Sequence, residues 1–262
     1  MTRGVGSKSA LARWQVAAGL AFVMWASAAS ADTYLIISLV GDRLTIFQAE
    51  QQAGSHMATT GKAQVVPLKD TQFDDFAVRT AGTVIGKALP GATVTLLRAK
   101  DPELYKMRNA WLDADSIDVR GLVELIKRLF DPPPDSHLLL ITPYRDELQL
   151  ATDRAHYGKG TRGAGLGFYL DGATPMHDAD TLNQGNGFLG VFTNFQILLI
   201  NLRDDSVEAQ ERVVVGTTFA ASAAPDKTPW NALSADRKVD ALKYLLKTEI
   251  DRSLPRMLSA RR

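Results

Sequence analysis

The chain has 262 residues, of which 30 are basic and 29 acidic, and it contains no cysteine. A nearly neutral chain without clustered Lys and Arg lacks the basic surface that nucleic-acid binding needs, so we expect no nucleic-acid partner. The absence of cysteine excludes disulfide bonds, thiolate metal sites and a cysteine nucleophile. It also removes the acylated cysteine of bacterial lipoproteins, so we expect no lipid anchor.

The first 31 residues have the pattern of a secretory signal peptide. Basic side chains precede an apolar run over residues 16–25, and Ala29-Ser30-Ala31 then provides the small residues of a cleavage site before Asp32. The run is shorter than the roughly twenty residues that a membrane-spanning helix needs, and we expect no transmembrane segment elsewhere. We therefore expect a signal peptide over 1–31, cleaved between Ala31 and Asp32, and a mature domain over 32–262. The location would be the periplasm or the medium of a Gram-negative bacterium.

The mature sequence begins with apolar, strand-forming residues at 34–40 and 43–47, separated by Gly41-Asp42. This pattern predicts either a tight hairpin or one strand that leads into a turn. The polar stretch over 48–69 has no clear period and predicts a long loop. A helix should follow from Thr71, with Asp74 as a capping partner, and Pro90-Gly91 should end it.

Two more strands and one more helix are expected over the next fifty residues. Residues 93–98 and 137–142 are rich in β-branched and apolar residues, whereas an apolar stripe at helical spacing follows Ser116. The prolines after Asp131 should end this helix. The alternation of strand, helix, strand, helix and strand is typical of parallel pairing through right-handed crossovers.

After Pro143 the pattern changes to consecutive strands without helices, which indicates antiparallel pairing. A final helix should run from Ser234 to Pro255. The strands are expected over residues 147–152, 166–170, 188–203 and 207–221, and the last two should form a hairpin. The predicted fold class is therefore α/β: one domain of two or three layers with a mixed sheet, a βαβαβ start, an antiparallel hairpin and a C-terminal helix.

Residues 41–44 read Gly-Asp-Arg-Leu at the end of the first strand. Gly-Asp-Ser-Leu in this position would suggest an esterase of the SGNH type, but Arg43 replaces the nucleophilic serine. A backbone turn is therefore the favoured interpretation. Asp42 and Arg43 still lie where open α/β sheets tend to bind ligands, at the carboxyl end of a strand.

A second candidate is the glycine-rich stretch over 158–167, which contains Lys159 and Arg162. Backbone N–H groups of such loops can hold phosphate, but a phosphate loop leads into a helix, whereas this stretch leads into a strand. A flexible connection between strands is favoured, with Arg162 as a possible ligand contact.

Four polar residues between 171 and 180 form a third candidate: Asp171, His177, Asp178 and Asp180. Their carboxylate and imidazole groups could hold a divalent cation, yet their spacing matches no calcium loop, so a solvated loop is favoured. His177 remains a candidate ligand contact. We expect no metal and no other cofactor.

The order of elements over residues 34–254 resembles the periplasmic α/β domain of curli-secretion and penicillin-binding-protein-activator lipoproteins and the N-terminal domain of TolB. The resemblance lies in the strand over 137–141, in Phe195-Gln196-Ile197-Leu198-Leu199-Ile200-Asn201-Leu202-Arg203-Asp204-Asp205-Ser206-Val207-Glu208, and in the helix after this hairpin. The lipoprotein cysteine is absent, and the region 166–188 is longer than in that pattern. The resemblance implies a non-catalytic envelope component that contacts another protein.

Two functions follow as expectations. The favoured one is an exported accessory factor of envelope assembly or transport that binds an envelope protein and catalyses no reaction. The alternative is a periplasmic hydrolase of an envelope ester or glycan, with a site in the loops around Asp42, Arg162 and His177. An enzyme would need a concave site where titratable side chains converge.

Overall fold

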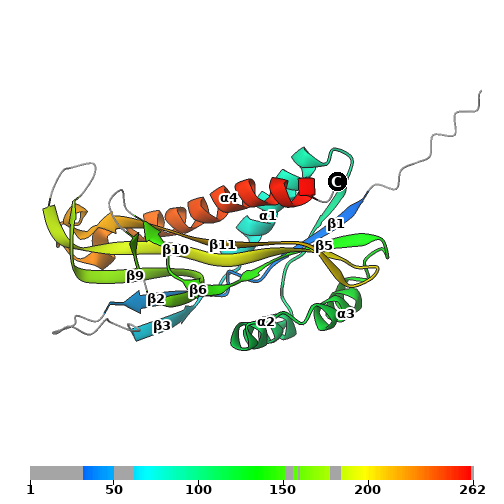
Figure 1. Cartoon of the computed structure of the whole chain (residues 1–262), viewed down its shortest axis with the longest axis horizontal. Coiled ribbons are helices and arrows are strands. Elements are labelled where there is room, and N and C mark those ends of the chain that lie inside the picture. The colour runs from blue at the N-terminus through cyan, green and yellow to red at the C-terminus, as the bar shows by residue number, and fades with distance from the viewer. Residues whose placement is uncertain (1–31, 50–61, 152–155, 159, 178–183, 261–262) are drawn as a thin grey trace, which may run out of the picture. The chain divides into compact units, whose positions relative to one another are not determined.

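A mixed β-sheet with helices on both faces organises the chain (Figure 1). The computed structural model describes residues 32–49, 62–151, 156–158, 160–177 and 184–260, which belong to one compact unit. Ala31 and the predicted signal peptide lie outside the described residues. The α/β fold class, with parallel and antiparallel strands, is confirmed.

Eleven strands are found among the described residues, together with four α-helices and two short 3-10 helices. The strands are β1 (Thr33–Ser38), β2 (Arg43–Gln48), β3 (Lys62–Pro67), β4 (Thr93–Leu96), β5 (Ser136–Pro143), β6 (Arg145–Glu147), β7 (Leu150–Ala151), β8 (His156–Tyr157), β9 (Arg162–His177), β10 (Gln184–Asn201) and β11 (Ser206–Ala220). The helices are α1 (Gln72–Ala88), α2 (Pro102–Ala114), α3 (Val119–Phe130), α4 (Ala235–Ala260), η1 (Ala221–Ala223) and η2 (Pro229–Ala232).

The long strand β10 joins two sections of the sheet. Along one edge, its first half pairs with β9 and its second half pairs with β5, both antiparallel, while β11 pairs with it along the other edge. The first section continues from β5 to β1 and then β4, all parallel, as the βαβ pattern predicts. The second section continues from β9 to the parallel strand β2 and then to the antiparallel strand β3.

Consecutive strands β1 and β2 belong to different sections and do not pair with each other. Since β5 and β9 both run antiparallel to β10, their parallel partners β1 and β2 run in the same direction. The chain therefore passes straight on from one section to the other through Leu39, Val40, Gly41 and Asp42. The hairpin interpretation of Gly41-Asp42 is wrong, because each strand finds its partners elsewhere.

Helices cover the sheet from two sides (Figure 1). On one face, α1 and α4 bury an apolar core that includes Phe73, Ile85 and Leu246. On the other face, α2 and α3 cover the first section with a core that includes Leu104 and Ile126. The helix that was expected after Ser116 has the predicted stripe, since Leu122, Leu125 and Ile126 are buried. Within the described part of the chain, no α-helix combines the length and apolar character that crossing a bilayer requires.

Several expected boundaries need correction. The expected loop over 48–69 contains β3, whose mostly exposed residues have no clear apolar period. Helix α2 was not predicted, although Asp101 caps its N-terminus by accepting a hydrogen bond from the N–H of Glu103, and Pro102 follows at a position that favours proline.

Two further corrections concern glycine and proline. Residues 162–167 of the glycine-rich stretch belong to β9 and not to a flexible loop, and Asp171 and His177 lie on the same strand. Helix α4 continues past Pro255 to Ala260. Its last turns bury Leu254, Met257 and Leu258, and this packing outweighs the backbone hydrogen bond that the proline removes.

Candidate functional site

A buried ion pair lies where the chain passes from β1 to β2. The guanidinium of Arg108 on α2 makes two bonds to the Asp42 carboxylate, with Nη1–Oδ1 at 2.5 Å and Nη2–Oδ2 at 2.8 Å. It also donates to the carbonyl oxygen of Leu39 at 2.9 Å. The Arg108 side chain is only 1% exposed, whereas that of Asp42 is 22% exposed. This pair ties α2 to the junction between the two sections of the sheet.

Arg43 contacts the same carboxylate from the solvent side, with Nη2 at 2.9 Å from Oδ2 of Asp42. Burial alone would raise the pKa of the Asp42 carboxyl, but the hydrogen bonds and charges of Arg108 and Arg43 outweigh burial and lower it. Asp42 is therefore a firmly ionised, fully engaged carboxylate.

A second carboxylate, Asp74, is buried beside this pair at the start of α1. Its Oδ1 accepts hydrogen bonds from Ser38 Oγ at 2.7 Å and from the N–H groups of Val40 at 2.8 Å and Gly41 at 3.0 Å. Its Oδ2 accepts one from the Tyr105 hydroxyl at 3.3 Å. Asp74 therefore fastens the end of β1 and does not cap α1 as the sequence suggested.

Burial dominates the electrostatics of this second group. It raises the pKa of Asp74 to about 6 in spite of the four donors. Burial, and then the charge of Asp74, also raises the pKa of Tyr105. A Cβ atom at Gly41 would lie 2.7 Å from the backbone N of Asp74, so glycine permits this close approach.

The polar groups at the end of β1 bond to one another and to the neighbouring backbone. Arg108 pairs with Asp42, and Tyr105 donates to Asp74. The Arg108 guanidinium lies 5.2 Å from the centre of the Tyr105 ring, so the two pairs form one network that connects α1, α2 and β1. We therefore interpret this network as a structural latch, because its carboxylates already accept bonds from protein donors. Arg108 was missed by the sequence analysis, although it shares a buried helical stripe with Leu104 and Trp111, and a charged residue on such a stripe is a usable signal.

The remaining predicted contacts are spread along β9. Arg162 begins the strand, and its Nη2 lies 3.7 Å from Oδ2 of Asp115. His177 ends the strand, where its backbone pairs with Gln184, and its side chain lies outside the described residues. Fifteen steps of about 3.3 Å put the two residues roughly 50 Å apart along the strand. Asp42 thus lies with Arg43, but the structure does not bring Arg162 and His177 together.

The predicted acidic cluster is only partly described. Asp171 accepts hydrogen bonds from the N–H of Ala173 and from the Thr174 side chain and N–H, whereas Asp178 and Asp180 lie outside the described residues. Across the described ranges, no group of three His, Asp or Glu residues is close enough together to hold a metal ion.

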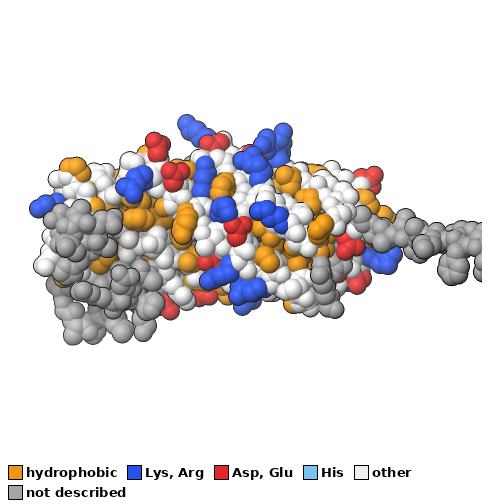
Figure 2. All heavy atoms as spheres, turned by 90° about the horizontal axis from the view of Figure 1, so that it is seen from above, with side chains coloured by type: hydrophobic (Ala, Val, Ile, Leu, Met, Phe, Trp, Pro, Cys, Tyr) orange, Lys and Arg blue, Asp and Glu red, His pale blue; other side chains and the backbone are white. Residues whose placement is uncertain are grey.

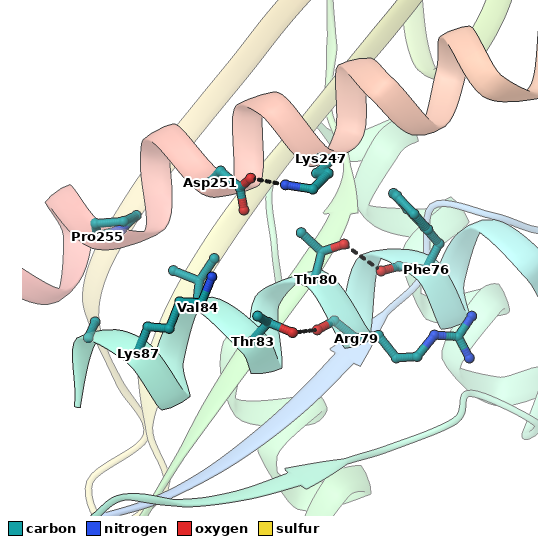
Figure 3. Close-up of a pocket in the computed structure, with 10 residues that line it drawn as sticks. Phe76, Arg79, Thr80, Thr83, Val84, Lys87, Lys247, Asp251 and Pro255 are labelled. Carbon is teal, nitrogen blue, oxygen red and sulfur yellow. Dashed lines mark hydrogen bonds and ion pairs between the residues drawn. The ribbon is translucent and has the colours of Figure 1, made fainter. Parts of the chain in front are cut away.

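A groove of about 630 Å3 lies between α1 and α4 (Figure 3). Its apolar lining comes from Phe76, Val84, Ala88 and Pro255. Phe76 and Val84 lie on α1, and Pro255 lies across the groove on α4 (Figure 3). Ala88 is the last residue of α1. We call this the α1–α4 groove.

Basic side chains border the α1–α4 groove. Arg79 and Lys87 come from α1, and Lys247 comes from α4, where it pairs with Asp251 of the next turn. Lys243 of α4, which does not line the groove, lies 5.9 Å from the centre of the Phe76 ring. Figure 2 looks onto the side that α1 and α4 form and shows Lys and Arg side chains interspersed with hydrophobic and acidic ones. The groove therefore combines an apolar floor with a border of three cations and one carboxylate, Asp251.

No protein family and no curated protein sequence matches this chain.

Proposed function

We propose that this chain is an exported binding protein that holds an acidic, amphipathic segment of a partner protein in the α1–α4 groove. The observation that carries this proposal is the two cations Arg79 and Lys87 on α1, which form no salt bridge within the described residues and border an apolar floor opposite the Lys247–Asp251 pair of α4. An amphipathic segment would place its apolar side chains on this floor and its carboxylates at the border, which is a recurrent mode of helix recognition. Charge complementarity would set orientation and speed association.

Binding is favoured over hydrolysis because the buried carboxylates already accept hydrogen bonds from protein donors. The Asp42 carboxylate is held by Arg108 and Arg43, and Asp74 is held by four donors. A general base or nucleophile needs a lone pair directed at a substrate, whereas these oxygens are directed at protein donors.

A partner protein is favoured over a lipid surface. Attraction to anionic lipid usually involves clusters of four to eight cations, each contributing about 1 kcal/mol. One of the groove's cations, Lys247, is already paired with Asp251. The envelope partner that the sequence resemblance implies is part of this proposal.

Export is the second part of the proposal, and the leader pattern over 1–31 supports it. The predicted mature terminus coincides with the start of the sheet, because the carbonyl oxygen of Asp32 accepts a hydrogen bond from the N–H of Thr93 and β1 begins at the next residue. N-terminal sequencing of the protein recovered outside the inner membrane should begin at Asp32. Recovery of the uncleaved chain from the cytoplasm would contradict export.

The groove is tested by charge reversal with a matched control. The probe is a fluorescent, helix-forming peptide with Leu on one face and Glu on the other, and binding is followed by anisotropy. Arg79→Glu with Lys87→Glu should weaken binding at least about tenfold, or about 1.4 kcal/mol, and added salt should weaken wild-type binding. The control, Lys106→Glu with Arg120→Glu on the opposite helix layer, makes the same net charge change and should leave binding within about twofold.

Three outcomes would contradict the proposal. Equal losses in both double variants would mean that net charge and not the groove decides binding. Equal binding of a peptide with Lys in place of Glu would remove the role of the basic border. Sedimentation with phosphatidylglycerol vesicles that is lost in the groove variant, without peptide binding, would favour a membrane surface instead.

A further inference from the structure

A second, smaller pocket opens where β5 ends, on the side of the sheet that α2 and α3 cover. It has a volume of about 200 Å3 and lies among the end of α2, the segment that leads into α3, and strands β5, β10 and β11. Thr142 and Pro143, the last residues of β5, form one wall. The carboxyl end of a parallel strand is the position where open α/β sheets bind small ligands. This pocket does not involve the α1–α4 groove.

Two guanidinium groups border this pocket. The Arg212 guanidinium lies 4.8 Å above the centre of the Tyr144 ring, which orients it. Arg145 lies near Asp113, at an Nη2–Oδ1 distance of 3.9 Å, which is longer than a hydrogen bond. The Asp115 carboxylate also lines the pocket, and it pairs with Arg162 at 3.7 Å. Both cations therefore retain N–H groups that can donate to an anionic ligand.

Two further donors are buried in the pocket walls. The indole N–H of Trp111 and the hydroxyl of Thr142 have no hydrogen-bond partner among the described residues. A buried donor without an acceptor is unfavourable and is rare in folded proteins. Neighbouring atoms cover both donors, so side chains of the pocket wall must move before a ligand oxygen can reach them. A ligand with several acceptor oxygens would satisfy them.

We propose that this pocket binds a small, polar carboxylate. A carboxylate is planar and can accept paired hydrogen bonds from a guanidinium, here that of Arg145 or Arg212. A second oxygen-bearing group of the ligand would face Trp111 and Thr142. Polar side chains of Gln196 and Ser116 line the same space, which suits a polar ligand of a few carbon atoms better than an apolar one.

The indole N–H of Trp111 provides a direct readout. In a 1H–15N spectrum of the full chain labelled at tryptophan, the cross-peak that disappears in Trp111→Phe is assigned to this group. Titration with succinate should shift this cross-peak saturably. Succinamide, which has the same size but no charge, should not shift it.

Arginine variants separate recognition from general electrostatics. Arg145→Gln with Arg212→Gln should weaken succinate binding at least tenfold. Arg203→Gln with Arg237→Gln removes two exposed charges elsewhere and should leave affinity within twofold. The comparison of succinate with succinamide uses the wild-type chain, so its outcome does not depend on whether the arginine variants fold.

The proposal fails if succinate up to about 10 mM, ten times a 1 mM dissociation constant, leaves the Trp111 cross-peak in place. It also fails if inorganic phosphate gives the same shift at the same concentrations, because the pocket would then be an unselective anion site. An undiminished succinate response in the Arg145→Gln, Arg212→Gln variant would likewise overturn it.

Discussion

Replacing Asp42 with Asn removes the negative charge from the buried Arg108 guanidinium while it keeps the size of the side chain. Arg108 is almost fully buried, and its two bonds to Asp42 are 2.5 and 2.8 Å long. Loss of one partner of a buried pair usually destabilises a protein by about 3–5 kcal/mol. Here Arg108 retains bonds to Leu39 O at 2.9 Å and Asn109 Oδ1 at 2.7 Å, and Asn can still accept one bond. We therefore expect a smaller loss, about 2–3 kcal/mol in the free energy of unfolding.

The assay is urea unfolding followed by circular dichroism, with Asp75→Asn as the matched control. Asp75 also pairs with an arginine, Arg98, but that arginine is 52% exposed. An exposed pair of this kind contributes at most about 1 kcal/mol. A thermal melt gives a second readout. For a chain of this length the melting temperature falls by about 2–4 °C per kcal/mol lost, so Asp42→Asn should lower it by about 4–12 °C. A loss for Asp42→Asn no larger than that for Asp75→Asn would refute the interpretation of this network as a structural latch.

Two other measurements test the packing at the same junction and in the second section. Burial raises the pKa of Asp74 to about 6, above its value in the unfolded chain. Protonation of Asp74 therefore stabilises the folded state fully below about pH 4, and this stabilisation is lost as the pH rises through 6. The free energy of unfolding of wild type relative to Asp74→Asn should fall by about 2–3 kcal/mol between pH 4 and 7. An unchanged difference across this range would contradict the raised pKa. A Cβ at Gly167 would lie 2.1 Å from the Thr45 carbonyl oxygen, so Gly167→Ala should destabilise the fold by about 3 kcal/mol or more. The control, Gly172→Ala, has open space around the added Cβ and should change stability by less than about 0.5 kcal/mol. Similar urea midpoints for the two variants would disprove the close packing of β9 against β2 at Gly167.

The sequence predicts one side of the α1–α4 groove and one residue of the structural latch, but not the parts that face them. The apolar face of α1, including Phe76 and Val84, follows from helical spacing. The partner of that face does not, because Lys247 and Pro255 approach it from a helix more than 150 residues later. The position of Asp42 after a strand marks it as a candidate, but its partner Arg108 is 66 residues away, on a helix that the apolar spacing does not predict.

The sequence by itself determined the α/β class, the parallel start over β1, β4 and β5, and the hairpin of β10 and β11. These features depend on local periodicity and on glycine and proline positions, which act over a few residues. Only the tertiary structure decided that β1 and β2 continue into different sections of the sheet and that a buried Asp42–Arg108 pair fastens the passage between them. Strand pairing and buried ion pairs depend on contacts between segments that are far apart in the sequence and on which charged groups those contacts remove from water. A pattern of neighbouring residues does not specify such contacts.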